Sequence, residues 1–311
     1  MTEAKRIVIA GGSGFIGTAL AREFIERGYA VVVLTRMPHE RSDGVQEVAW
    51  NGEHVGEWVQ YLDGAEAVIN LAGKNINCPH TKKNLQEIHA SRVNSVFAIA
   101  AGIMHAKTPP QVWVQASAVG YYGDTGDKLC DESAPNGTNA LAKICQDWEG
   151  TSDYAKNFVK PPTLRKVTLR IGFVLGRDGG ALPVLATLVR LFLGGTVGSG
   201  RQYISWIHVA DLVQMFVATV ENERLSGPFN AVAPNPVTNE EFMRELRHAL
   251  HRPWSPRVPE FAVRLGALLM RGEPSLGLIS QRCSPSRFGE IEFPFRFPDL
   301  PSALQNLCHK S

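Results

Sequence analysis

Four glycines fall within residues 11–17, GGSGFIG, directly behind the apolar run RIVIA. Between a strand and a helix, this G-x-x-G-x-x-G spacing is typical of a dinucleotide-binding turn. Gly11 permits a sharp turn, Gly14 lets the backbone approach a pyrophosphate, and Gly17 lets the helix pack closely on the sheet. The free N–H groups and the dipole at the start of the helix favour phosphate groups. The predicted phosphate-binding residues are Gly11, Gly12, Ser13, Gly14, Phe15, Ile16 and Gly17, and the alternative is a glycine-rich turn without a ligand.

The end of the next apolar run, VVVLTR, indicates which dinucleotide would bind. Sites for NAD usually place Asp or Glu at this point to hold the ribose 2′-hydroxyl. This chain has Thr35 and Arg36 instead. A hydroxyl beside a guanidinium would bind a 2′-phosphate through charge-assisted hydrogen bonds, whereas a carboxylate would repel it. The predicted cofactor is therefore NADP(H), and the alternative for Arg36 is a plain surface charge.

Strand and helix patterns alternate through the first half of the chain and would position these residues. Solid Val, Ile and Leu runs are expected of strands that are buried on both faces of a parallel sheet. The alternation predicts an α/β fold, a Rossmann-type doubly wound parallel sheet. Strands are predicted at residues 6–10, 30–35, 45–50, 67–71, 112–117 and 166–171, and helices at 15–27, 85–105 and 140–153.

The character of the sequence changes after residue 171, where glycine-rich and proline-rich connections become frequent. We predict an NADP(H)-binding Rossmann domain over residues 1–171, with a late strand near 227–233 that returns to its sheet. Residues 172–311 are predicted to form a smaller C-terminal substrate lobe, partly interleaved with the first domain.

Six short motifs spread along the chain resemble one family. They are GGSGFIG (11–17), VINLAG (68–73), SRVNS (91–95), SAVGYYG (117–123), LRIGFVLG (169–176) and SWIHVADL (205–212). Together they resemble the atypical extended short-chain dehydrogenase/reductases. The matching branch is that of the epimerase family proteins, which are nucleotide-sugar-epimerase-like and include members with cell-division-inhibitor names. The resemblance covers nearly the whole chain and implies a Rossmann-type domain, a small C-terminal substrate lobe and an NADP(H) site.

The resemblance also implies further cofactor contacts by position. The end of the fourth strand would pass the adenosine side of the cofactor. The following helix carries an arginine where relatives often place a cofactor-contacting Asn, with a glutamate about one turn earlier as a further candidate. The residue that follows the sixth strand would lie near the nicotinamide, and ordinary packing is the alternative for the apolar positions. The residues concerned are Leu71, Ala72, Gly73, Glu87, Arg92 and Val174.

Redox members of this family use Ser or Thr with a Y-x-x-x-K motif, in which tyrosine transfers a proton and lysine lowers the tyrosine pKa. None of the six tyrosines here has Lys at the fourth following position. The expected place carries Asn139 and Lys143 instead. Ser117 ends the fifth strand as required. Counting back from YG (122–123), however, would put the catalytic hydroxyl at position 118, which is an alanine in this chain. The predicted catalytic residues are Ser117, Tyr121 and Tyr122, with aromatic packing as the alternative for the tyrosines.

Three other polar residues lie in motifs that could carry chemistry. His208 and Asp211, in WIHVAD, resemble part of a catalytic triad, but the chain has no G-x-S-x-G nucleophile elbow. We expect His208 to make structural hydrogen bonds and Asp211 to cap a helix that begins at Leu212. For Glu132, in CDES, we favour a cap or surface role over a position in the cleft.

The overall composition limits the partners. With 20% charged residues and a formal net charge of +2, the chain does not resemble proteins that bind nucleic acid or a membrane surface. The five cysteines include no C-x-x-C pair and indicate reduced thiols. No Cys/His cluster has ligand spacing, so no metal is expected. The N-terminus leads straight into the first strand without room for a signal peptide, which predicts a cytoplasmic location.

These observations leave two functions open. The first is an NADP(H)-binding oxidoreductase or nucleotide-sugar-epimerase-like enzyme that acts on a small polar substrate, as a monomer or homodimer. The second rests on the missing Y-x-x-x-K motif. It is a cofactor-binding regulatory or scaffold protein with weak or lost catalysis.

Overall fold

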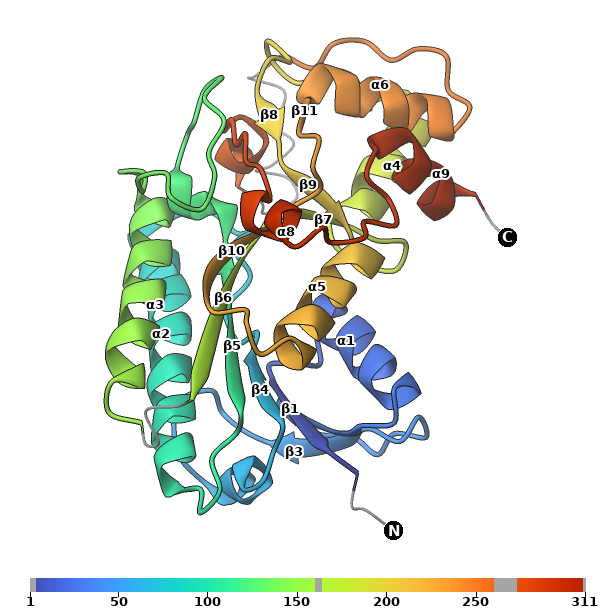
Figure 1. The fold of residues 1–311 in the computed structure, drawn as a ribbon. Helices are drawn as coiled ribbons and strands as arrows, with labels where there is room; N and C mark the ends of the chain where they lie inside the picture. Colours follow the sequence, from blue (N-terminus) through green and yellow to red (C-terminus); the bar gives the residue numbers. More distant parts are fainter. Residues whose placement is uncertain (1–3, 160–163, 260–272, 310–311) are drawn as a thin grey trace.

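A seven-stranded parallel sheet forms the centre of the computed structural model, which describes residues 4–159, 164–259 and 273–309 (Figure 1). Its strand order is β10-β6-β5-β4-β1-β2-β3. Every neighbouring pair is parallel, which confirms the doubly wound sheet predicted from the sequence. The strands are β1 (Arg6–Ala10), β2 (Ala30–Thr35), β3 (Gln46–Ala49), β4 (Ala67–Asn70), β5 (Val112–Ala118), β6 (Arg165–Ile171) and β10 (Gly227–Ala231).

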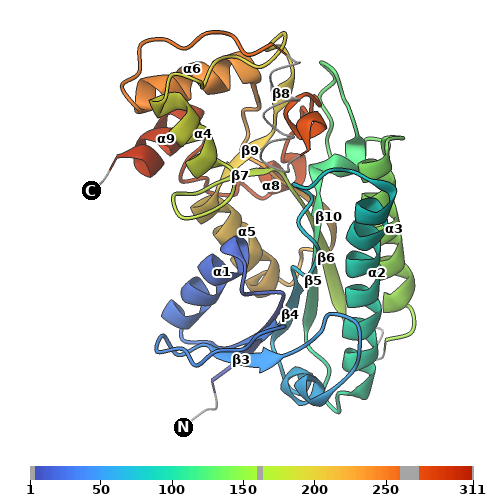
Figure 2. The ribbon, with the colours of Figure 1, turned by 180° about the vertical axis from the view of Figure 1, so that it is seen from behind.

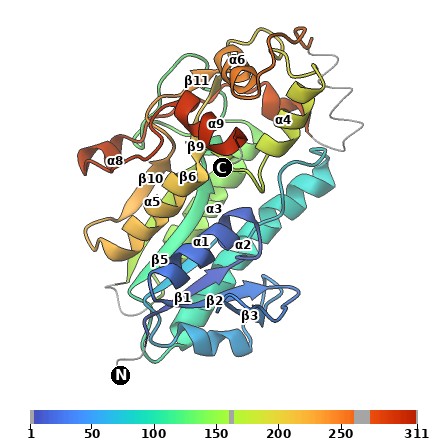
Figure 3. The same cartoon turned by 90° about the vertical axis from the view of Figure 1, so that its right-hand side faces the viewer.

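Two helices cover each face of the sheet (Figures 1 and 3). The helices α1 (Phe15–Glu26) and α5 (Val209–Glu221) lie on one face, and α2 (Lys82–His105) and α3 (Ala140–Lys156) lie on the other. The helix α2 begins three residues before its predicted start because the Thr81 side chain accepts a hydrogen bond from the Asn84 N–H and caps it. No helix in the described part of the chain is long and apolar enough to cross a membrane.

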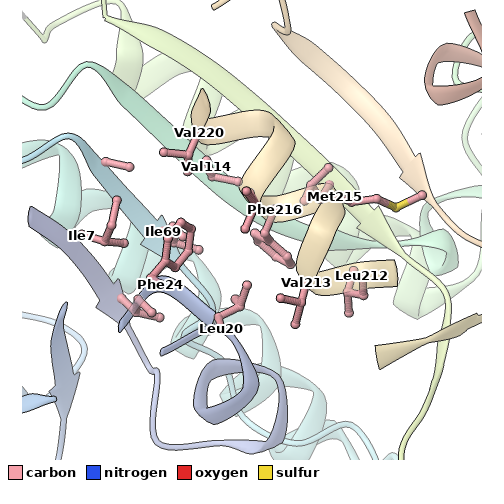
Figure 4. Packing of buried hydrophobic residues seen from close by; sticks show 14 of the residues in the cluster. Ile7, Leu20, Phe24, Ile69, Val114, Leu212, Val213, Met215, Phe216 and Val220 are labelled. Atoms are coloured by element: carbon pink, nitrogen blue, oxygen red, sulfur yellow. The ribbon is translucent and has the colours of Figure 1, made fainter. Parts of the chain in front are cut away.

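The strands are apolar on both faces because each face packs against helices. Ile7 and Ile9 of β1 belong to the core under α1 and α5, whereas Val8 belongs to the core under α2 and α3. In the first of these cores, Phe24 of α1 and Phe216 of α5 lie over the sheet among strand residues (Figure 4). This two-sided burial explains the solid apolar runs in the sequence.

A smaller lobe packs beyond the carboxyl ends of the strands (Figure 2). Its helices α4, α6 and α9 share one apolar core with the short strand β9. The late strand β10 lies beside β6 at the edge of the main sheet, and the predicted lobe boundary at residue 171 stays a prediction. The remaining elements are β7 (Phe173–Leu175), α4 (Leu182–Arg190), β8 (Tyr203–Ile204), β9 (Trp206–His208), β11 (Val237–Thr238), α6 (Asn239–Ala249), α8 (Ser286–Glu290) and α9 (Leu300–Cys308), with 3-10 turns η1 (Glu57–Leu62), η2 (Val119–Tyr122) and η3 (Pro274–Gly277).

The strand order reverses between β4 and β1. In open sheets of this kind, ligands bind in the crevice beyond the carboxyl ends of the two strands that flank the reversal. The glycine turn follows β1 and residues 71–73 follow β4, so the topology brings both predicted segments to this crevice.

Phe15 connects the glycine turn to the smaller lobe. Its ring lies against the loop after β7, where a Cβ atom at Gly176 would be 2.1 Å and one at Gly179 2.5 Å from ring atoms. The two glycines therefore make room for the ring, and the start of α1 is held by the loop that leads into α4.

Two helix glycines should respond in opposite directions to substitution by alanine. A Cβ atom at Gly17 would lie 2.4 Å from the Gly12 Cα, whereas one at Gly150 in α3 would meet nothing within 4 Å. We expect Gly17→Ala to lower the free energy of unfolding by about 1–3 kcal/mol through overpacking. Gly150→Ala should raise it by about 0.5–1 kcal/mol through helix propensity. Urea unfolding of both variants checks this, and a Gly17→Ala protein as stable as wild type would contradict the close approach.

Candidate cofactor and catalytic site

The first half of the glycine turn is shaped by one positive φ angle and one close backbone contact. Gly11 has a φ of +72°, a conformation that favours glycine. A Cβ atom there would lie 2.8 Å from the Cα of Ala72, in the segment after β4. The turn after β1 and the segment after β4 therefore touch through their backbones, and the structure brings these predicted residues together.

Gly14 leaves the mouth of the turn open. It is exposed and is the N-cap of α1, and a Cβ atom at this position would meet nothing within 4 Å. No side chain of the described residues caps this helix start, so the N–H groups of its first turn remain available. Free N–H groups at the positive end of a helix dipole attract phosphate. The turn thus fits the pyrophosphate of a dinucleotide.

The end of β2 supplies a hydroxyl and a guanidinium next to the turn. The Thr35 hydroxyl donates a hydrogen bond to the Ser13 Oγ at 3.2 Å, which ties β2 to the glycine turn. Arg36 is exposed immediately beyond it. Two nearby carboxylates, Asp43 of the following connection and Glu47 of β3, share an ion pair with Arg41. The group that follows β2 at the turn is therefore cationic, which fits a 2′-phosphate better than a free ribose hydroxyl.

Arg92 of α2 lies directly against the segment after β4. Its Nη1 donates to the carbonyl oxygens of Lys74 and Ile88, at 3.1 and 3.0 Å, and its guanidinium lies 4.9 Å from the ring centroid of Trp148. A Cβ atom at Gly73 would be 3.2 Å from the Arg92 Cζ. Burial lowers the pKa of Arg92. The structure thus fixes a cation beside the predicted adenosine-side segment.

The two remaining predicted cofactor residues lie in different surroundings. Glu87 is exposed on α2 and forms an ion pair with Lys74. Val174 lies on β7, paired with Ile207 of β9, and packs against the core under α1 and α5. Leu71 also packs against this core. Packing thus accounts for part of the environment of both apolar residues.

The predicted catalytic serine belongs to a buried ion-pair network. Ser117, at the end of β5, donates a hydrogen bond to the Oε1 of Glu149 on α3 at 2.5 Å. Arg170 of β6 binds the same carboxylate through Nε, at 3.0 Å, and Nη2, at 2.8 Å. Burial alone would lower the pKa of Arg170, but the hydrogen bonds and the charge of Glu149 outweigh it and raise that pKa. The network therefore stays charged, and the Ser117 hydroxyl is one of its donors.

Both predicted tyrosines contact the same arginine. The Tyr122 hydroxyl accepts a hydrogen bond from the Arg170 Nη1 and donates one to the Asn230 Oδ1, both at 2.8 Å. Burial raises the pKa of Tyr122 above its ordinary value. The Tyr121 ring lies flat against the guanidinium, with its centroid 3.6 Å from the Arg170 Cζ. Ser117, Tyr121 and Tyr122 thus form one cluster around Arg170.

The place of the missing Y-x-x-x-K motif has a structural use. The Asn139 side chain accepts a hydrogen bond from the Ala142 N–H at 2.8 Å and caps α3. Lys143 is exposed on the first turn of that helix. In the position of the usual tyrosine, this chain therefore carries a helix cap.

Several residues of the network were not predicted from the sequence. Arg170, Glu149 and Asn230 come from three elements, and the available signal was an arginine inside an apolar strand, which requires a buried partner. The expected surface role of Glu132 is wrong, whereas its Oε1 does accept from the Arg287 N–H in the first turn of α8, at 3.4 Å. The Glu132 side chain is 9% exposed, and its Oε1 accepts from the N–H of Asn230 at 2.9 Å. Its Oε2 is buried and has no partner among the described residues.

His208 makes structural hydrogen bonds as expected, whereas Asp211 does not have its expected role as a helix cap. The helix α5 begins at Val209, and the His208 Nδ1 caps it by accepting from the Ala210 N–H at 3.0 Å. Asp211 instead accepts from the backbone N–H groups of Arg296 and Phe297, at 2.8 and 2.9 Å. Asp211 therefore anchors the C-terminal segment and does not cap the helix, whereas the expected structural hydrogen bonds of His208 are present.

Comparison with known proteins places this geometry in a family. Residues 7–231 match the NAD dependent epimerase/dehydratase family, and residues 258–307 match a domain of unknown function, DUF1731. The epimerase family protein SDR39U1 homolog, chloroplastic, of Arabidopsis thaliana is 36% identical over 305 residues, which cover 96% of this chain and 85% of the relative.

Solved structures agree with the sequence match. The human epimerase family protein SDR39U1, solved with NADPH, is 30% identical with a TM-score of 0.83, covering 97% of this chain and 99% of that one. MoeE5, solved in complex with UDP-glucuronic acid and NAD, is 18% identical with a TM-score of 0.76, covering 97% of both chains, and shares the fold.

Acid should weaken the folded state through His208. Burial lowers the pKa of His208 from 6.5 to about 4. Its Nδ1 also has to stay unprotonated to accept the hydrogen bond that caps α5. As the pH falls below 6.5, the unfolded chain takes up the proton first, so stability is lost between 6.5 and about 4. We expect His208 to lower the free energy of unfolding by about 2 kcal/mol when the pH falls from about 7.5 to 5.

The variant His208→Asn isolates this effect, because Asn also caps helices but does not titrate. Urea unfolding at both pH values should show a smaller acid-induced loss in the variant than in wild type. Equal losses in both proteins would mean that His208 is not held neutral by the fold.

Proposed function

The chain belongs to the NAD dependent epimerase/dehydratase family, and from this premise we propose that it binds NADP(H) and acts as an oxidoreductase or epimerase on a small polar substrate, a nucleotide-sugar being the class that we favour. The observation that carries the proposal is the open mouth of the glycine turn at Gly14, flanked by the exposed Arg36. The solved relative with NADPH supports the choice of cofactor.

In the proposed complex, each part of the crevice binds a different part of the cofactor. The N–H groups at the start of α1 hold the pyrophosphate, and Thr35 with Arg36 holds the 2′-phosphate. The segment 71–73, backed by Arg92, lies on the adenosine side, and Val174 lies on the nicotinamide side. The bound cofactor would supply hydride chemistry, and the chain's own residues would bind it, orient it and provide the proton.

For the proton, we propose the cluster around Arg170. Ser117, Tyr121 and Tyr122 are the hydroxyl groups that the sequence places near the nicotinamide. Tyr121 is half-buried, and the structure records no hydrogen bond of its hydroxyl among the described residues. This makes Tyr121 the hydroxyl whose donor capacity is least committed to the network.

A second candidate function is a cofactor-binding regulatory or scaffold protein. It is favoured by the commitment of Ser117 and Tyr122 to the buried network and by the raised pKa of Tyr122, which burial causes. Asn139 as the cap of α3 points in the same direction, since it replaces the usual acid with an amide. A cytoplasmic location and a monomeric or homodimeric state stay predictions under either function.

Arg36 should decide the choice between the two nicotinamide cofactors. We expect wild type to bind NADPH at least tenfold more tightly than NADH, because a charge-assisted contact contributes roughly 1.5–3 kcal/mol. Arg36→Ala should lose this preference through weaker NADPH binding alone. Fluorescence titration measures both affinities, with Arg22→Ala, an exposed arginine of α1, as the matched control. Equal affinities in wild type would overturn the NADP(H) assignment.

Turnover separates the two functions. With NADPH and a panel of carbonyl compounds and nucleotide-sugars, we expect product formation that falls about 10²–10⁴-fold when the proton donor is removed. The variants are Ser117→Ala, Tyr121→Phe and Tyr122→Phe, and their NADPH affinity should change little. Circular dichroism checks that each one is folded, because Tyr122→Phe also removes a partner of Arg170. Turnover that survives all three changes would contradict the catalytic cluster, and tight binding without turnover in wild type would favour the regulatory function.

A further inference from the structure

A polar cavity lies at the edge of the sheet and is lined by residues of α3, of β6 and of the start of β10. Figure 1 shows these three elements. Its volume is about 610 Å³, within the range of small-molecule sites. Lys166, Thr168 and Arg170 alternate along β6 and therefore face it together. None of the residues lining this edge cavity belongs to the glycine turn or to β1, β2 or β4.

The lining carries more positive than negative charge. Three cationic side chains and two carboxylates face the edge cavity, which leaves a surplus of one positive charge. The cations are Lys156, Lys166 and Arg170, and the carboxylates are Glu149 and Asp153. A concave site with one dominant sign of charge attracts ligands of the opposite sign.

One of the three cations is fully used by the fold, because Arg170 binds Glu149. Arg165 lies on β6 with its guanidinium on the opposite face of the sheet, where it donates to the carbonyl oxygens of Thr219, Val220 and Leu225 around the end of α5. These contacts hold the walls of the edge cavity in place.

The two lysines are the cations that a ligand could engage. Lys166 is 7% exposed, and it pairs with Asp153, whose side chain is 72% exposed. Because the Asp153 end of this ion pair lies mostly in water, a ligand can reach the pair from solvent. Lys156 follows Asp153 on the same face of α3 and is half-buried at the rim.

We infer that the edge cavity binds a small oxyanion, held by Lys156 and Lys166 with the hydroxyl of Thr168. Phosphate and carboxylate groups share the chemistry that these donors recognise. The site is separate from the proposed cofactor turn, so one can exist without the other. It borders the ion pair of Arg170 and Glu149, and its ligand would therefore lie against the network that holds Ser117 and Tyr122.

Calorimetric titration of the full chain with citrate and with inorganic pyrophosphate tests this, with sodium chloride at matched ionic strength as the screening control. We expect saturable binding of at least one of the two anions, weakened about tenfold by Lys156→Ala and by Lys166→Met, since each removes one charge-assisted contact. Lys143→Ala, an exposed lysine on the first turn of α3 outside the edge cavity, should bind like wild type.

A Gly14→Val variant distinguishes the edge cavity from the glycine turn, because a side chain there fills the mouth of the turn but leaves the edge cavity intact. Citrate or pyrophosphate binding should persist in it. Binding that is lost in Gly14→Val but unchanged in both lysine variants would overturn the inference and place the anion at the turn. Absence of binding to wild type at anion concentrations up to about 10 mM would also overturn it, since a dissociation constant above this value is too weak for a specific site. Circular dichroism shows that each variant is folded, and Lys156→Ala at the rim keeps the test valid if Lys166→Met does not fold.

Discussion

A guanidinium buried at the carboxyl end of β6 is the constraint that organises the polar interior. Arg170 is 4% exposed, and an unpaired charge in such a place would cost several kcal/mol. Three acceptors from different parts of the chain bind the guanidinium and offset this cost. They are the Glu149 carboxylate of α3, the Tyr122 hydroxyl of η2 and the carbonyl oxygen of Glu132. The Tyr121 ring covers the remaining face of the guanidinium. Arg170 therefore links both α3 and η2 to the sheet, in addition to the apolar packing of α3.

The same constraint separates binding from chemistry in this chain. The hydroxyl groups proposed for proton transfer belong to the network around Arg170. Ser117, at the end of β5, donates a hydrogen bond to Glu149. The glycine turn after β1 is shaped instead by backbone approach and by the hydrogen bond from Thr35 to Ser13, with Gly14 facing open space. A change that disturbs the network can thus leave the turn intact. The glycine turn and the Arg170 network are therefore separate parts of the structure, which is why both proposed functions are compatible with one fold.

The parts that the sequence predicted are those set by local chain geometry. The glycine turn, the apolar strands and the end of α1 before Gly28, which has a φ of +83°, each depend on a few neighbouring residues. The network depends on partners far apart, and the contact of Tyr122 with Asn230 spans 108 positions. Asp211 illustrates the limit, because an acidic residue in the first turn of a helix resembles a cap in the sequence. Its real partners are backbone N–H groups 85 and 86 residues later, which no local pattern encodes.

Two buried carboxylates of the family domain bind the backbone of the C-terminal segment. Asp211 accepts hydrogen bonds from the backbone N–H groups of Arg296 and Phe297. Glu132 accepts one from the backbone N–H of Arg287 at 3.4 Å. Burial raises the pKa of both carboxyl groups, and the backbone donors oppose this by favouring the charged form. Any residue except proline supplies such an N–H group. Side chains add to this attachment, because the Arg287 guanidinium donates to the Pro228 carbonyl oxygen and the Phe297 ring stacks on His208 with a centroid distance of 3.9 Å. The path of the segment is therefore held by its backbone and by these side chains together.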